Sequence, residues 1–250
     1  MPWNQWRSHT LGASRWLLAP ERRWLLLLAF AAAGLATFME LADEIVDDDD
    51  LLAFDRGVLT YLRGWRTPML TMRAVDLTAI GSVTVLSLVS LCTFVGLLRL
   101  GDRRGALQFV LTMVGVMLWT FLTKTWFARE RPEMAHRLLE VSGYSFPSGH
   151  SSGTSALMVG MAMVFMPHLR TLANRVWLLS SCCAFALLIG FTRMYLGVHY
   201  PSDVASGLAF GSSWALLIAA LFEWLRPRWA EPRPPDEDPA PRTGAETLPR

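Results

Sequence analysis

A chain of 250 residues is long enough for one or two soluble domains, but its composition argues against a soluble fold. Charged residues make up 18% of the chain, below the roughly one quarter typical of soluble domains, and hydrophobic residues make up 52%. The formal net charge of +2 is too small to indicate a nucleic-acid-binding protein, so no nucleic-acid partner is expected. The composition therefore favours a membrane protein in contact with the lipid bilayer.

The first 23 residues are basic with interleaved tryptophans, a pattern that suits a membrane interface. An uncharged apolar run over 24–39 follows, near the short end of what crosses a bilayer. A cleaved signal peptide is the alternative interpretation, because basic residues precede a short apolar core and Ala36 lies where a cleavage site would be expected. We expect a retained helix, since further apolar runs follow.

The next stretch, residues 40–50, is acidic and ends in the four aspartates 47–50. It is predicted to be a solvated loop; a divalent-cation site is the alternative, although the spaced Asp and Gly pattern of a calcium loop is absent. Residues 51–65 then place apolar side chains close to helical spacing with charges among them. This pattern predicts a helix that lies in the membrane interface instead of crossing it.

Five further apolar runs are predicted to span the membrane: 77–98, 105–123, 154–169, 176–192 and 204–225. With the first run they give an all-α membrane protein of six transmembrane helices and one additional interfacial helix. Gly207 and Gly211, four residues apart in the last run, suggest a helix-packing face. We expect three regions: a basic cytoplasmic N-terminal segment (1–23), the membrane domain (24–225), and a disordered Pro-rich cytoplasmic tail (226–250).

The distribution of basic residues predicts the orientation. With six spans, the N-terminal segment, the links 99–104 and 170–175, and the start of the tail all fall on one side. The positive-inside rule makes that side cytoplasmic, with both termini inside. The unfavoured outer side nevertheless carries several cations, which an anionic ligand would explain: Lys124, Arg129, Arg131, Arg137 and Arg193.

The first candidate motif is the basic run from Lys124 to Pro132. An arginine fork such as that of Arg131 suits bidentate phosphate contacts, and the lysine adds a compact point charge. Pro132 ends any helix and would fix the turn after Arg131. Contact with lipid headgroups is the alternative role for such a cluster at a membrane edge.

The second motif, Pro147-Ser-Gly-His150, directly precedes an apolar run. Proline suits a helix start, Ser148 can cap the helix, and Gly149 lets the backbone approach a ligand. The exposed N–H groups and positive dipole end of that helix would bind an anion. His150 would then lie beside a bound phosphate; an ordinary capped helix with an interfacial histidine is the alternative.

The third motif contains Arg193, His199 and Asp203. An aspartate in the first turn of the last span can reach back to a histidine in the preceding loop. That contact would fix the tautomer of His199 and leave its other ring nitrogen free to attack an electrophile.

The three motifs occur in this order on one predicted face, and together they resemble the signatures of the type 2 phosphatidic acid phosphatase (PAP2) superfamily. The signatures lie at 124–132, 144–150 and 192–203, and the resemblance extends over roughly residues 50–225. Two positions depart from the common pattern. Thr192 stands where serine is usual, which retains a hydroxyl, and Glu130 is an acidic neighbour between two arginines.

The resemblance implies a PAP2/haloperoxidase-like helical core and a metal-independent phosphatase without a cofactor. It implies that His199 is the nucleophile, forming a phosphohistidine, that Asp203 orients it, and that His150 is the general acid. The residues expected to hold the phosphoryl group are Lys124, Arg131, Ser148, Gly149 and Arg193; none is expected to bind a metal.

By the same resemblance the substrate is a membrane lipid phosphate cleaved at the periplasmic or extracytoplasmic face of the cell (inner) membrane. Polyprenyl (undecaprenyl) diphosphate is the first choice, and glycerolipid phosphates such as phosphatidate and phosphatidylglycerophosphate are the others. A non-catalytic lipid-phosphate binder or transporter is the alternative function. A vanadate-dependent haloperoxidase, which shares the anion pocket, fits less well because those enzymes are soluble. No oligomeric state is predicted.

Overall fold

The computed structural model describes residues 22–47, 49–133 and 137–226. Over these ranges the chain is helical and contains no strand, which confirms the predicted all-α class. The predicted N-terminal segment, Asp48 and the tail beyond Arg226 lie outside the described residues. The helices are α2 (Arg23–Asp47), α3 (Asp49–Arg63), α4 (Pro68–Ile80), α5 (Val83–Arg99), α6 (Arg103–Phe127), α7 (Gly149–Phe165), the short 3-10 helix η3 (Met166–His168), α8 (Leu172–Tyr195) and α9 (Pro201–Trp224).

Helix α2 is longer than predicted. It begins where the first apolar run begins but continues to Asp47, through residues predicted to form an acidic loop. Asp43 and Glu44 follow Glu40 by three and four residues, so they share one side of the helix with it and can stay in water while the helix continues. Phe38 and Ala42 are buried on another side. The prediction of a loop is therefore wrong over 40–47.

The apolar run 77–98, predicted to be one span, is interrupted in the structure. The structure has two helices, α4 and α5, which meet at an angle of 44°. Thr67 caps the start of α4, directly before Pro68, which suits a first helical position. Ser82 caps α5 by accepting a hydrogen bond from the backbone N–H of Val85, so the chain stops one helix and starts the next at Gly81–Ser82.

The outer surface of the bundle is apolar. Four helices, α2, α6, α8 and α9, are long and apolar enough to cross a membrane, and the bent pair α4–α5 would be a fifth span. Large side chains on the outer faces, such as Leu88, Val114 and Leu118, are more than half exposed. Water is a poor solvent for so large an apolar surface, whereas lipid tails cover it. The chain is therefore a multi-pass membrane protein.

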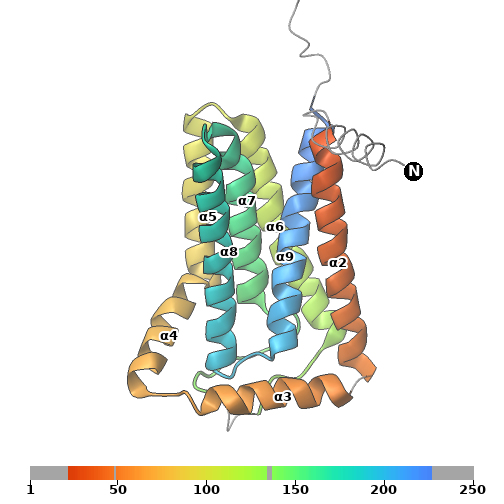
Figure 1. The fold of residues 1–250 in the computed structure, drawn as a ribbon, viewed down its shortest axis with the longest axis vertical. Coiled ribbons are helices and arrows are strands. Elements are labelled where there is room, and N and C mark those ends of the chain that lie inside the picture. Colours follow the sequence, from red (N-terminus) through yellow and green to blue (C-terminus); the bar gives the residue numbers. More distant parts are fainter. Residues whose placement is uncertain (1–21, 48, 134–136, 227–250) are drawn as a thin grey trace, which may run out of the picture.

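The ends of the bundle differ in charge and structure. Helix α3 lies across one end of the bundle, crosswise to the long helices (Figure 1). The loops that carry the three motifs lie at this same end. The basic links 99–104 and 170–175 lie at the opposite end, where the chain connects α5 to α6 and α7 to α8 (Figure 1).

Two glycines of α9 allow it to pack closely against α7. A Cβ added to Gly207 would lie 2.7 Å from the carbonyl oxygen of Ser148, and one added to Gly211 would lie 2.2 Å from that of Ser152. Both distances are too short for any side chain. The predicted packing role of the Gly-xxx-Gly pair is confirmed, and it holds the third motif against the second.

Replacing Gly211 by alanine should destabilise the protein by about 1–3 kcal/mol, because the new methyl group meets a backbone oxygen that cannot rotate away. Thermal unfolding in detergent measures this effect as a lower Tm. Gly96→Ala in α5 is the matched control, since a Cβ there has no neighbour within 4 Å. Equal Tm values for the two variants would contradict the close α7–α9 contact.

Candidate active site

The three motif segments meet in one cavity, at the end of the bundle where α6 and α8 stop and α7 and α9 begin. Its volume is about 420 Å³. The cavity collects three cations together with Glu140, so its charge favours an anion. Six of the eight predicted site residues line it: Lys124, Arg131, Gly149, His150, Arg193 and His199.

Two of the cations are held in place and still offer donors to a ligand. Lys124 Nζ donates to the backbone carbonyls of Tyr144 at 2.7 Å and Ser145 at 3.1 Å, which occupies two of its three protons. Arg193 donates from Nη1 to Thr78 Oγ1 at 2.9 Å. Its buried Nε has no hydrogen-bond partner among the described residues. A buried donor of this kind is unfavourable unless it meets an acceptor, and an anion in the cavity would supply one.

His199 lies in the loop between α8 and α9. Its Nε2 is 3.1 Å from Arg131 Nη1, and its Nδ1 is 3.5 Å from Asp203 Oδ2. A guanidinium can only donate, so Nε2 carries the lone pair and Nδ1 the proton. Burial lowers the pKa of His199 to about 3; Asp203 opposes this effect and Arg131 adds to it. The residue is thus a neutral imidazole whose Nε2 lone pair faces the cavity.

Asp203 stands behind His199 and is fully buried in the first turn of α9. Its Oδ2 accepts hydrogen bonds from the backbone N–H of Tyr200 at 2.9 Å and from the hydroxyl of Ser145. Its Oδ1 accepts from Arg129 Nη1 at 2.7 Å. Ser145 Oγ also lies 3.4 Å from His199 Nδ1. The sequence analysis assigned no role to Ser145. Its position within the signature 144–150 is the one feature of the sequence that points to this residue.

His150 and Gly149 form the first positions of α7 on the cavity wall. The His150 ring packs near the break between α4 and α5, since a Cβ added to Gly81 would lie 3.2 Å from His150 Cδ2. A Cβ added to Gly149 would lie 3.7 Å from Lys124 Cε, an ordinary contact, so protein packing does not require glycine there. The space in front of Gly149 belongs to the cavity, at a helix end that favours an anion.

Ser148 does not line this cavity. It is fully buried as the N-cap of α7, where its Oγ accepts from the backbone N–H of Ser151 at 3.5 Å and from the Ser151 hydroxyl at 3.0 Å. An N-cap oxygen must turn back toward the helix to accept such bonds, which takes it away from the cavity. Ser148 therefore fixes the start of α7, and contact between its hydroxyl and phosphate stays a prediction.

Arg129 does not line the cavity, although the sequence groups it with the cations expected to meet an anionic ligand. It bridges two buried carboxylates, with Nη1 on Asp203 and Nη2 on Asp55 Oδ2 at 2.9 Å. The grouping of Arg129 with the ligand-binding cations is thus wrong, because these two carboxylates neutralise its charge. His136, which sequence reasoning left without a motif role, lies outside the described residues.

Asp55 was missed at the sequence level, although the sequence contains a signal for it. Leu59 and Leu62, four and seven residues further along α3, are buried with it on one helical face. A carboxylate in line with an apolar stripe must find a partner when it is buried. The interfacial pattern predicted for 51–65 identifies the helix but not which charged residue faces the protein.

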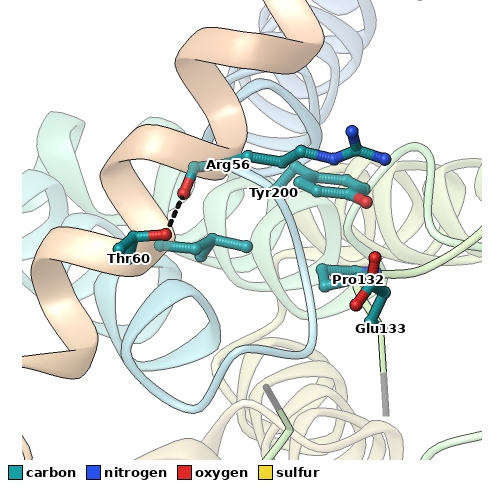
Figure 2. Close-up of a pocket in the computed structure, with 6 residues that line it drawn as sticks. Arg56, Thr60, Pro132, Glu133 and Tyr200 are labelled. Carbon is teal, nitrogen blue, oxygen red and sulfur yellow. Dashed lines mark hydrogen bonds between the residues drawn. The ribbon is translucent and has the colours of Figure 1, made fainter. Parts of the chain in front are cut away.

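A smaller cavity of about 170 Å³ lies between α3 and the loop that follows α6. Figure 2 shows Arg56 lying along Tyr200, with Pro132 and Glu133 across from them. The Cζ atom of Arg129 lies 4.5 Å from the centre of the Tyr200 ring. None of the eight predicted site residues lines this cavity, so the cavity of about 420 Å³ is the candidate active site.

Comparison with known proteins agrees with this geometry. Residues 105–227 match the model of the PAP2 superfamily, and the matched part contains all three motifs, α6 without its first two residues, and α7 to α9. The crystal structure of a transmembrane PAP2-type phosphatidylglycerolphosphate phosphatase from Bacillus subtilis has a TM-score of 0.73 at 24% identity, covering 79% of this chain and 98% of that one. The fold is therefore that of a PAP2 membrane phosphatase. Residues 105–227 place this chain in the PAP2 superfamily.

Curated relatives share this assignment. Phosphatidylglycerophosphatase B of Bacillus subtilis is 26% identical over 83% of this chain and 96% of its own length. Lipid A 1-phosphatase of Rhizobium johnstonii is 37% identical over 44% of this chain and 45% of its length. Undecaprenyl-diphosphatase BcrC of Bacillus subtilis is 30% identical over 50% of this chain and 62% of its own length. These relatives are phosphatases, and by family this chain is a PAP2-type phosphatase.

Proposed function

We propose that this chain removes a phosphoryl group from lipid phosphates or diphosphates through a phosphohistidine on His199. The observation that carries the proposal is the presence of His150 and His199 in one cavity with three cations. Phosphoryl transfer requires mainly that the reacting groups be positioned and that negative charge on the equatorial oxygens be neutralised. The cavity offers both a neutral nucleophile and the positive charge.

In the first step, His199 Nε2 attacks phosphorus. The N–P bond forms while the P–O bond to the lipid breaks, and the proton on Nδ1 faces Asp203, which stabilises the positive charge that develops on the ring. Arg131 donates to Nε2 in the free protein. On substrate binding this hydrogen bond would move to a phosphoryl oxygen and release the lone pair for attack. Lys124 and Arg193 would hold the other oxygens.

His150 completes both steps as acid and base. In the first step it gives a proton to the oxygen that leaves phosphorus. In the second step it takes a proton from water as the water oxygen bonds to phosphorus. The N–P bond then breaks, His199 returns to the neutral form and inorganic phosphate leaves. Ser148 supports this chemistry by capping the helix that carries His150.

The substrate class is proposed from the membrane surroundings and the relatives. A phosphate pocket at the end of a lipid-exposed bundle suits a molecule whose headgroup enters the cavity while its tails stay in the bilayer. Relatives are named for phosphatidylglycerophosphate, lipid A 1-phosphate and undecaprenyl diphosphate. We retain polyprenyl diphosphate as first choice, with phosphatidate and phosphatidylglycerophosphate as the other candidates.

We further propose six membrane spans: α2, the bent pair α4–α5 as one span, α6, α7, α8 and α9. Helix α3 then lies in the interface beside the active site. The basic links at the opposite end favour a cytoplasmic position for that end. The active site would face the extracytoplasmic side of the cell (inner) membrane. Residues 24–225 would form one membrane domain between the cytoplasmic segments 1–23 and 226–250.

Phosphate release from the purified protein tests the proposed function. We expect hydrolysis of at least one member of a panel of polyprenyl diphosphate, phosphatidate, phosphatidylglycerophosphate and lipid A 1-phosphate. We also expect EDTA to leave the rate unchanged, because Lys124, Arg131 and Arg193 supply the charge that a metal would otherwise provide.

Two outcomes would contradict these expectations separately. Loss of activity in EDTA that returns with Mg²⁺ would show that the reaction needs a metal. Binding of these lipids without any phosphate release would instead favour a non-catalytic binder or transporter.

A further inference from the structure

Asp55 lies outside all three motifs and outside the part of the chain that matches the family model. Its side chain is nevertheless as buried as that of Asp203, at 0% exposure each. Besides Arg129, it accepts hydrogen bonds from the backbone N–H of Ser202 at 3.0 Å and from the Ser202 hydroxyl at 2.5 Å. A carboxylate taken so far from water requires partners of this quality, so its position is fixed tightly.

Arg129 connects this carboxylate to the catalytic pair. One nitrogen of its guanidinium donates to Asp203 at 2.7 Å and to the Ser202 hydroxyl at 2.8 Å, and the other donates to Asp55 at 2.9 Å. The group is planar and its donors have fixed directions, so a carboxylate at each end determines its orientation. Helix α3 is thereby joined to the start of α9 through charged, nearly buried contacts.

We propose that Asp55 is a positioning residue of the reaction, which acts through Arg129 to hold the carboxylate of Asp203 against His199. The proposal rests on the phosphatase function proposed above. It makes helix α3, and not only the three motifs, part of the catalytic apparatus.

The contacts of Asp203 explain how this action reaches His199. One carboxylate oxygen accepts from Ser145 and Tyr200 on the side of His199, and the other accepts from Arg129. If Arg129 loses its anchor on α3, the second oxygen loses a fixed donor and the carboxylate gains freedom to turn. The Nδ1 side of His199 is then held less firmly, and so is the direction of its Nε2 lone pair.

The cations that bind phosphate have separate supports. Arg193 is held by Thr78, Lys124 by two backbone carbonyls, and Arg131 by the carbonyl of Val198 at 2.9 Å. None of these contacts involves Asp55 or Arg129. A loss of Asp55 should therefore slow the chemical step while anion binding is retained.

Asp55→Asn tests this prediction, because asparagine has the same shape and still accepts from Ser202, but it lacks the charge that anchors Arg129. We expect kcat to fall by roughly 10²-fold, the effect of a small misplacement of reacting groups, with KM and competitive inhibition by inorganic phosphate unchanged. Asp43→Asn on the exposed side of α2 is the matched control and should keep the activity of the original protein.

A second variant guards against misfolding, since Asp55→Asn takes away one of the two buried carboxylates that hold Arg129. Asp55→Asn combined with Arg129→Gln removes both charges, and its Tm reports folding. If Asp55 acts only through Arg129, the double variant should turn over as slowly as Arg129→Gln alone.

Three results would overturn the proposal: an unchanged kcat in Asp55→Asn, an equal loss of kcat and of phosphate inhibition, or a double variant much slower than Arg129→Gln. An original protein that releases no phosphate would instead contradict the proposed function itself.

Discussion

His199→Ala is expected to abolish turnover, lowering kcat/KM by on the order of 10⁴-fold or more. The variant lacks the proposed nucleophile, which is the one imidazole among the described residues lining the cavity that has a buried carboxylate beside it. Water, without that activation, would have to attack the phosphorus directly. Phosphate release gives the loss in rate. Denaturation at alkaline pH after incubation with a radiolabelled lipid phosphate, which preserves an acid-labile N–P bond, should trap a phosphoenzyme in the original protein and none in the variant.

His168→Ala is the matched control for this experiment. His168 lies exposed in η3, at the other end of α7 from the active site, so its removal should change neither the rate nor the trapped phosphoenzyme. Full activity in His199→Ala would favour a different nucleophile. A trapped phosphoenzyme in that variant would place the covalent bond on another residue.

His150→Ala is expected to give the second largest effect, a decrease in kcat of roughly 10²- to 10⁴-fold on a lipid monophosphate. An alkoxide leaves phosphorus poorly unless it receives a proton, and His150 lines the same cavity as the proposed nucleophile. The loss should be much smaller on p-nitrophenyl phosphate, because nitrophenolate is stable as an anion at neutral pH. The ratio of the two losses therefore measures proton donation apart from binding.

The same His168→Ala variant serves as control, with no change expected on either substrate. Equal losses on the two substrates would contradict a general-acid role for His150 and would indicate that it acts in binding. A trapped phosphoenzyme should still form in His150→Ala, more slowly than in the original protein.

The fold class and most helix positions could be predicted because they depend on local chemistry. Apolar runs of sufficient length, with basic links between them, predict the four helices α2, α6, α8 and α9 as candidate spans. The structure starts α4 at Pro68 and α9 at Pro201, earlier than the predicted runs 77–98 and 204–225; the fixed backbone angle of proline suits both starts. Successive spans cross the membrane in opposite directions, so their order along the chain gives the direction of each one. This is why the three motifs were expected at one end.

The errors in the predicted fold have a common cause. The break at Gly81–Ser82 lies within a continuous apolar run, so hydropathy alone gives no sign of it. The need for glycine at position 81 shows only in the folded chain, where His150 and α8 pack against the break. A Cβ on Gly81 would lie 2.5 Å from Ile189 Cγ2. Likewise, α2 extends through acidic residues because α9 packs beside it, a contact that no local signal predicts.

For the site, six of the eight predicted residues line one cavity because their order along the chain and the helix directions bring them to the same end. Charge and position alone could not sort the cations Lys124, Arg129 and Arg131, and only the family resemblance left Arg129 out of the residues expected to hold phosphate. Only the folded chain shows that Arg129 faces carboxylates 74 residues away in both directions, at Asp55 and Asp203.

The sequence by itself determined that the chain is helical and embedded in a membrane, and it predicted that histidines, cations and a helix start lie together at a phosphate site. Those properties come from hydropathy, proline and glycine geometry and short spacings, which act within a few residues. The tertiary structure decided which side chains face the cavity and which are buried behind it. Burial of a charge requires a partner, and the partner of a buried charge is fixed by packing between distant segments.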